Sequence, residues 1–138
     1  MTLRSWQETL AAGRVLVIDG GMGTELQRRG VPMDEVVWSG AAVLSHPEVV
    51  RRVHEDYIRA GADIIITNTF ASARHTLERT EMAGQVRELN TRAVTLAKEA
   101  REAAADDRPV HIAGSISTAF RAGAQRTSAN YKEQAEIL

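Results

Sequence analysis

A carboxylate followed by three glycines in four positions stands at the end of the first apolar run of the chain. The segment reads Asp19-Gly20-Gly21-Met22-Gly23-Thr24-Glu25-Leu26 and follows Val15-Leu16-Val17-Ile18, which predicts a buried strand. Glycines let backbone N–H groups approach a ligand closely, and the start of the following helix favours an anionic group. Asp19 adds an acceptor for an amine. The segment therefore favours a zwitterion, such as an amino acid, over a bare phosphate.

Two other interpretations of this turn compete with amino-acid binding. Glycine-rich turns between a strand and a helix also occur for steric reasons alone. Nucleotide binding is disfavoured, because a Walker loop needs Gly-Lys-Ser/Thr and the segment has no lysine. The dinucleotide fingerprint Gly-x-Gly-x-x-Gly/Ala also fails, since counting on from Gly21 and Gly23 places Leu26 at the last position.

The elements that must position this segment alternate between strands and helices. Apolar runs predict strands over residues 15–18, 64–66 and 110–113, and helical signals predict helices over 5–13, 23–29, 45–60, 84–105 and 130–138. Residues 33–44 and 120–128 are expected to be loops, and residues 71–79 a short loop or helix. This alternation predicts right-handed βαβ crossovers and a parallel sheet.

Each predicted strand ends in small or polar residues. These ends are Asp19-Gly20-Gly21, Thr67-Asn68-Thr69 and Gly114-Ser115. In α/β folds ligands bind at the carboxyl ends of the strands, so three consecutive ends with such side chains predict one shared site.

The bulk composition describes one globular domain over residues 1–138. Hydrophobic residues make up 43% and charged residues 25%, and 17 basic against 18 acidic residues give a net charge of −1. No nucleic-acid or membrane preference follows from this balance. The first residues resemble neither a signal peptide nor a membrane span, so a cytoplasmic location is expected. The absence of cysteine excludes disulfides, a thiol nucleophile and thiolate metal ligands from this chain.

Six blocks, taken in order, make the chain resemble the homocysteine S-methyltransferase family. They are Asp19-Gly20-Gly21-Met22-Gly23-Thr24-Glu25-Leu26, Trp38-Ser39, His46-Pro47-Glu48, Gly61-Ala62-Asp63, Thr67-Asn68-Thr69-Phe70 and Ala113-Gly114-Ser115. The resemblance covers about residues 14 to 138. It implies a (β/α)8 TIM barrel of typically ~250 residues or more, of which this chain supplies the first three βα units.

The resemblance also implies a substrate site. Asp19 is expected to accept hydrogen bonds from the homocysteine ammonium, and backbone N–H groups around Gly21–Thr24, with the Ser39 hydroxyl, to hold the carboxylate. Trp38 is expected to wall the pocket, or simply to cover an apolar edge. Thr67–Thr69 are expected to shape the pocket, or to satisfy hydrogen bonds of their own turn. The expected site residues are Asp19, Gly20, Gly21, Met22, Gly23, Thr24, Trp38, Ser39, Thr67, Asn68 and Thr69.

The metal of the family has no ligands in this sequence. Relatives bind zinc through three cysteines in the second half of the barrel, where the metal deprotonates the homocysteine thiol for attack on a methyl donor. This chain has no cysteine, and its four histidines, His46, His54, His75 and His111, are expected to be surface or structural residues. A second departure is Ile116-Ser117-Thr118, where many relatives carry Gly-Pro after the Gly-Ser pair.

Three functions remain open at this point. The first is the N-terminal part of a zinc-dependent homocysteine S-methyltransferase making methionine, inactive by itself, with a donor of the S-methylmethionine, betaine or methylfolate class. The second is a non-catalytic half-barrel that binds an amino acid or self-associates through the sheet edge left open after the third strand. The third is another barrel enzyme that acts on a different small acid.

Overall fold

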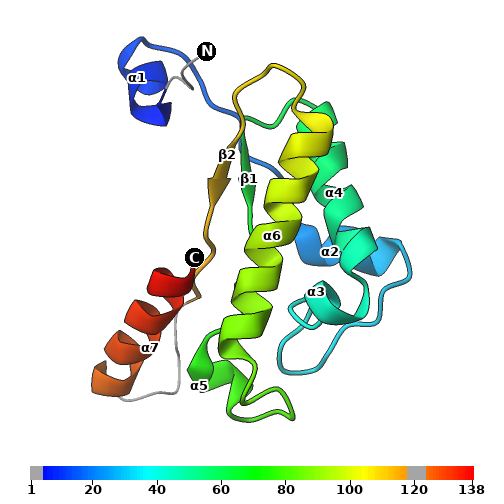
Figure 1. Cartoon of the computed structure of the whole chain (residues 1–138), viewed down its shortest axis with the longest axis vertical. Coiled ribbons are helices and arrows are strands. Elements are labelled where there is room, and N and C mark those ends of the chain that lie inside the picture. The colour runs from blue at the N-terminus through cyan, green and yellow to red at the C-terminus, as the bar shows by residue number, and fades with distance from the viewer. Residues whose placement is uncertain (1–4, 118–123) are drawn as a thin grey trace.

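The computed structural model describes residues 5–117 and 124–138. Its elements, in order, are α1 (Trp6–Ala11), α2 (Met22–Arg28), α3 (Ala42–Ser45), α4 (Pro47–Arg59), β1 (Ile64–Ile66), α5 (Arg74–Leu77), α6 (Val86–Ala104), β2 (His111–Ala113) and α7 (Ala124–Ile137) (Figure 1). Within the described ranges, no helix is long and apolar enough to cross a membrane.

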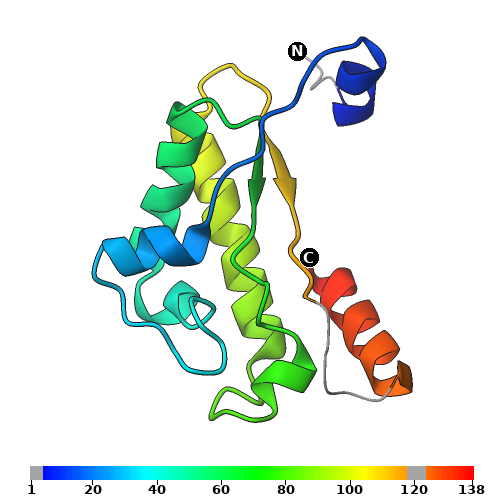
Figure 2. The same ribbon diagram turned by 180° about the vertical axis from the view of Figure 1, so that it is seen from behind.

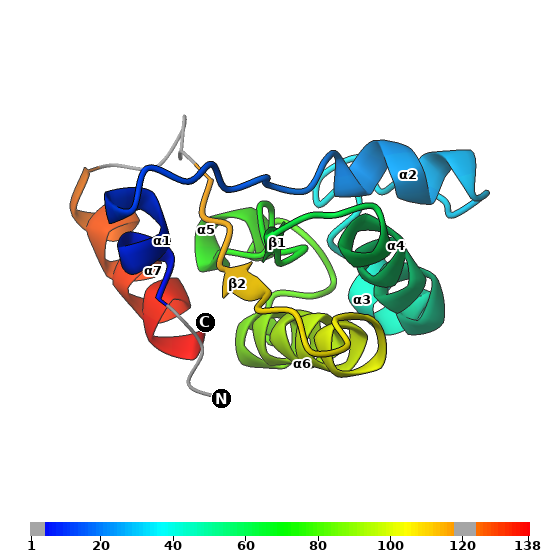
Figure 3. The same ribbon diagram turned by 90° about the horizontal axis from the view of Figure 1, so that it is seen from above.

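The predicted parallel sheet is confirmed for its second and third strands. β1 and β2 pair in parallel, with Ile64 opposite His111 and Ile66 opposite Ala113. The connection between them runs through α5 and α6, as expected for a βαβ crossover. Viewed from above, α4 and α6 lie on the same side of the two strands (Figure 3).

The core lies between α4, α6 and the sheet. The predicted apolar stripe of α6 is buried along its whole length: Val86, Leu89, Ala93, Leu96, Ala97, Ala100 and Ala104. Val50, Val53 and Ile58 of α4 and Ile65 of β1 are also buried. Small alanines on one face of α6 allow close packing, so this core fixes the position of β1 and the residues that follow it.

Most predicted helix ends are confirmed by their caps. Ser5 and Glu8 form both bonds of a capping box, at 2.9 and 3.2 Å. α2 is followed by Gly30 with φ 82°, and α4 by Gly61 with φ 108°. These are left-handed conformations that glycine adopts without steric cost. Pro47 occupies the first turn of α4, as predicted.

The prediction of a buried strand over residues 15–18 is wrong in its burial and its regularity. Val15 is 84% exposed and Ile18 57% exposed, and the segment forms a single bridge, Ile18 to Ile64. Its ladder is interrupted because the Val17 N–H donates to the Asp63 carboxylate at 2.9 Å instead of to a backbone carbonyl. The segment therefore runs alongside β1 at the sheet edge, with nothing over its outer face in the described structure.

Two further expectations need correction. Ser45 does not cap α4, because it is the last residue of α3, a short helix that begins within the predicted 33–44 loop. The Ser45 hydroxyl donates to the Ala41 carbonyl at 3.2 Å. The last helix begins at Ala124, so residues 124–128 are helical where a loop was predicted. The remainder of that predicted loop, residues 120–123, lies outside the described residues.

α1 lies apart from the core. None of its residues is buried, and both Figure 1 and Figure 2 place it beyond the strands, away from α4 and α6. Trp6 and Leu10 are about half exposed on it, at 48% and 49%. The N-terminal segment thus carries an exposed apolar surface that continues into the 15–18 segment.

Candidate functional site

A cavity of about 600 Å³ opens at the carboxyl ends of the strands. It is lined by nine residues of the predicted set, Gly20, Gly21, Met22, Gly23, Thr24, Trp38, Ser39, Thr67 and Asn68, together with Gln27, Met33, Ile66, Phe70 and Ser115. These residues come from four separate stretches of the sequence. The fold therefore gathers the three predicted strand ends around one space, as the sequence predicts, and the binding role of each residue stays a prediction.

Two of the three glycines of the turn, Gly20 and Gly21, lie close against the protein's own side chains. A Cβ on Gly20 would lie 2.8 Å from the Tyr57 hydroxyl oxygen, and one on Gly21 would lie 2.7 Å from Thr24 Oγ1. At Gly23 the nearest atom, Ser39 Oγ, would be at an ordinary 3.5 Å. The steric interpretation of the turn therefore holds for Gly20 and Gly21, and it does not exclude a ligand on the cavity side.

Asp19 has one carboxylate oxygen in use and one without a partner. Oδ2 accepts a 2.8 Å hydrogen bond from the Ile66 N–H. Oδ1 is buried and has no hydrogen-bond partner among the described residues. Burial raises the pKa of Asp19, against a smaller lowering by the Ile66 bond. An unpaired buried oxygen on an anionic group is an acceptor available to a cation.

Hydrogen bonds within the loop before α3 fix the position of Trp38. Asp34 Oδ1 accepts from the Val36 and Val37 N–H groups at 2.7 and 2.8 Å, and Asp34 and Trp38 exchange two backbone hydrogen bonds. Trp38 adopts a left-handed φ of 51° at the end of this turn. Its ring is 61% exposed and stacks against Phe70 at 6.1 Å and 21°. The two rings form an aromatic wall at the cavity.

Ser39 and Asn68 join this loop to the end of β1. The Ser39 hydroxyl donates to Asn68 Oδ1 at 2.9 Å, and Asn68 Nδ2 donates to the Ser39 carbonyl at 2.7 Å. Asn68 is buried, whereas Ser39 is partly exposed. We call this pair the Ser39–Asn68 latch. Because its only hydroxyl hydrogen is used here, Ser39 acts in this structure as a loop anchor.

Two predicted site residues do not line the cavity; one is Asp19 and the other is Thr69. Its Oγ1 donates to the Ser115 carbonyl at 2.8 Å and lies 2.8 Å from Thr67 Oγ1. Its carbonyl accepts from Gln134 of α7 at 2.8 Å. These bonds agree with the interpretation that Thr69 satisfies its own turn, whereas Thr67 contributes both to that network and to the cavity.

Five lining residues were absent from the expected site. Ile66 and Phe70 flank the predicted Thr67–Thr69 stretch, and Ser115 ends the third strand, so their positions could have been inferred from adjacency. Gln27 stands four residues after Gly23 on α2, which puts both on one helix face. Met33 gave no signal, because its place depends on the path of a loop.

Comparison with known proteins identifies the family of this chain. The family model described as homocysteine S-methyltransferase matches residues 16–138. A selenocysteine methyltransferase from Astragalus bisulcatus is 37% identical over 87% of this chain and 41% of its own length. Homocysteine S-methyltransferase from Escherichia coli is 36% identical over 74% of this chain and 34% of its own length.

Solved structures give the same result. The homocysteine methyltransferase MmuM from Escherichia coli matches in its metallated form with a TM-score of 0.78 and 27% identity, over 94% of this chain and 52% of that one. Its oxidized form matches with a TM-score of 0.84 over 98% of this chain and 53% of that one. The chain therefore spans about half the length of the solved structures, and less than half of the two relatives compared by sequence.

Proposed function

Because the chain belongs to the homocysteine S-methyltransferase family, we propose that its cavity holds homocysteine as the acceptor of a methyl group, in a reaction that gives methionine. The observation that carries this proposal is the buried, unpaired Asp19 Oδ1 beside the turn that lines the cavity. An ammonium group would supply the missing partner and offset the desolvation of the carboxylate.

The remaining parts of homocysteine would be held by the turn and the apolar lining. We propose that backbone N–H groups of the Gly21–Thr24 turn take the carboxylate, since the Ser39 hydroxyl already donates to Asn68. Met33 and Ile66 offer apolar surface to the methylene groups and the sulfur. This arrangement orients the thiol by fixing the opposite, zwitterionic end of the molecule.

The aromatic wall favours a cationic methyl donor. Trp38 and Phe70 stack at the cavity with exposed faces, and an onium group is attracted to such faces within about 6 Å of a ring centroid. A sulfonium or quaternary ammonium donor, of the S-methylmethionine or betaine class, would gain from this contact. A methylfolate would not gain in this way, because it presents no onium group.

The fold proposed for the complete enzyme is a (β/α)8 barrel. On this proposal the 15–18 segment, β1 and β2 are its first three strands, each followed by a helical connection.

The zinc of the family does not fit the residues present. No cysteine occurs in the sequence. Among the described residues, no three His, Cys, Asp or Glu side chains lie close enough together to hold a metal ion. We therefore expect this chain alone to form no methionine.

Calorimetric titration of the 138-residue chain tests the proposed acceptor. Homocysteine and 4-mercaptobutyrate share the thiol and the carboxylate, and only homocysteine carries the amine. We expect homocysteine to bind about tenfold tighter or better, because a charge-assisted hydrogen bond to Asp19 would be lost with the analogue. Equal affinities for the two, or no affinity for homocysteine, would refute the proposed site.

A second candidate function is an assembly module without catalysis. The observation in its favour is the exposed apolar edge formed by Val15, Val17 and Ile18, which has backbone pairing on only one side. Light scattering on the purified chain distinguishes the candidates. A monodisperse dimer would support assembly through this edge, whereas a monomer with homocysteine affinity would support the methyltransferase proposal.

A further inference from the structure

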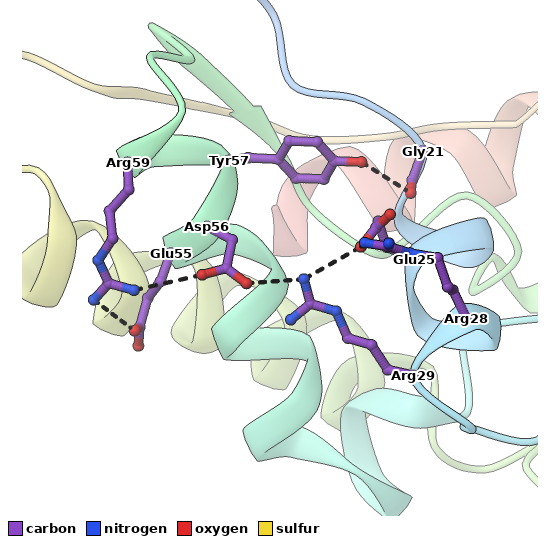
Figure 4. A network of polar contacts seen from close by, with 8 residues as sticks. All are labelled: Gly21, Glu25, Arg28, Arg29, Glu55, Asp56, Tyr57 and Arg59. Carbon is purple, nitrogen blue, oxygen red and sulfur yellow. Dashed lines mark hydrogen bonds and ion pairs between the residues drawn. The ribbon is translucent and has the colours of Figure 1, made fainter.

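Tyr57 of α4 contacts the glycine turn from the side of that helix. Its hydroxyl donates a 3.2 Å hydrogen bond to the Gly21 carbonyl (Figure 4). A Cβ on Gly20 would lie 2.8 Å from the same hydroxyl oxygen and 3.1 Å from the ring atoms Cε1 and Cζ. Tyr57 is not among the residues that line the cavity. It therefore touches the turn without forming part of the cavity wall.

Tyr57 is bonded to the turn through the Gly21 carbonyl oxygen. The carbonyl also accepts from Thr24 Oγ1 at 3.2 Å and from the Glu25 N–H at 3.4 Å. All three bonds are long, so none of them alone holds the carbonyl firmly. No cis peptide bond occurs in the described residues, and a trans peptide points the next N–H away from the carbonyl. Whatever fixes the Gly21 carbonyl therefore fixes the Met22 N–H.

An ion pair joins the end of α2 to α4 next to Tyr57. Arg29, the residue after α2, bonds Asp56, the residue before Tyr57, at 2.8 Å, and it bonds Glu25 of α2 at 3.2 Å (Figure 4). Arg28 also bonds Glu25, at 2.8 Å. Exposed ion pairs contribute little stability each, but the Arg29–Asp56 pair ties the residue next to Tyr57 to the end of α2.

The Tyr57 hydroxyl remains a donor at neutral pH. Burial raises the pKa of Tyr57, and the negative charges of Glu25 and Asp19 raise it further. The phenol therefore keeps its proton at neutral pH and can donate to the Gly21 carbonyl.

We propose that Tyr57 is a positioning residue, which holds the Gly20–Met22 backbone in the conformation that forms the glycine wall of the cavity. The inference rests on the proposed function where it concerns homocysteine. On this inference, residue 20 is a glycine because the ring of Tyr57 leaves no room for a Cβ atom there. Tyr57 and Gly20 together connect α4 to the site.

Substitution Tyr57→Phe tests the hydroxyl, because it retains the ring. We expect the backbone amide resonances of Met22 and Gly23 to shift in the two-dimensional ¹⁵N–¹H spectrum, and homocysteine affinity to fall about three- to tenfold, the range for loss of one hydrogen bond. The matched control is Tyr131→Phe on α7, whose ring packs edge-on against His75 at 6.0 Å. It should change neither quantity.

The possible outcomes separate this inference from the proposed function. Unchanged Met22 and Gly23 resonances together with unchanged affinity in Tyr57→Phe would overturn the role of Tyr57. If the parent chain binds no homocysteine, the proposed function fails, and the amide resonances alone decide whether Tyr57 positions the turn.

A double substitution tests the contact between the ring and Gly20. Gly20→Ala should lower the free energy of unfolding in the parent chain, because the added Cβ meets the ring. The same change should cost less in a Tyr57→Leu background, in which that space is freed. Equal costs in the two backgrounds would contradict the assignment of Gly20 to Tyr57.

Discussion

At the scale of single residues, the molecule contains buried polar atoms without partners. Asp19 Oδ1 is one, and both ring nitrogens of His54 are others among the described residues. Their surroundings differ. Asp19 adjoins the cavity-lining turn in the sequence, whereas His54 is fully buried in α4. We therefore propose a ligand as the partner of the Asp19 oxygen, whereas the unpaired nitrogens of His54 are a cost to stability.

His54 should make stability depend on pH. Burial lowers the pKa of His54 to about 4, below the value of about 6.5 in an unfolded chain. Between these values the unfolded state binds a proton that the folded state does not. The free energy of unfolding should therefore fall as the pH falls from 6.5 towards 4, by about 2 kcal/mol at pH 5.

Urea unfolding of the parent chain and of His54→Leu, each at pH 7.5 and pH 5, measures this contribution. The substitution removes the titrating group, so the difference between the two pH values should shrink by about that amount. A loss of stability on acidification that is equally large in His54→Leu would show that other groups cause it.

The Ser39–Asn68 latch should control the loop that carries Trp38. Asn68→Ala removes both of its hydrogen bonds and leaves the Ser39 carbonyl without its donor. We expect stability to fall by about 1–3 kcal/mol and hydrogen exchange to accelerate over residues 33–40. Asn130→Ala on α7, also a buried asparagine, is the matched control and should leave exchange of that loop unchanged. Unaltered exchange in Asn68→Ala would contradict the latch.

At the scale of elements, the site depends on a sheet that is regular only between β1 and β2. The 15–18 segment is held at the edge by three bonds near its end: the Asp63 and Ile64 N–H groups donate to the Val17 carbonyl at 2.7 and 3.1 Å, and the Asp19 N–H donates to the Ile64 carbonyl at 2.9 Å. Asp63 adds its carboxylate, which also pairs with Arg108 at 3.1 Å. Asp19 is therefore positioned by an edge segment and not by a complete strand.

Asp63→Ala should loosen this edge. The Val17 N–H loses its acceptor and Arg108 loses its ion-pair partner, although Arg108 still donates to the Ile58 carbonyl at 2.7 Å. We expect amide exchange at Val17 to accelerate about tenfold, and exchange at the β1–β2 bonds to stay as it is. Equal protection of Val17 in the parent and the variant would show that the carboxylate does not hold the segment.

The sequence predicted elements well where local signals determine them. The Ser5 capping box, Gly30, Pro47 and Gly61 mark helix ends that the structure confirms. The exposure of Val15 and Ile18 could not be predicted from local signals, because it depends on whether another part of the protein covers the outer face of this edge. The presence of Met33 in the cavity lining could not be predicted either, because its position depends on the path of the loop before α3.

At the scale of the whole molecule, the described residues combine a cavity at the strand ends with an exposed sheet edge at residues 15–18. The strand ends that the sequence singles out meet at a single space, which is why most of the predicted residues line it. Tyr57 was not predicted as part of this arrangement, since its role comes from the packing of α4 against the turn. The family match over residues 16–138 extends across both the cavity and the edge.

The central claim is that Asp19 recognises the ammonium of homocysteine, and calorimetric titration of Asp19→Asn against the parent chain tests it most directly. The asparagine retains an acceptor for the Ile66 N–H and removes the negative charge. The matched control, Asp107→Asn, changes an exposed aspartate in the connection between α6 and β2. We predict an affinity loss of about tenfold or more for Asp19→Asn and none for Asp107→Asn. Homocysteine affinity that is unchanged in Asp19→Asn would contradict the claim.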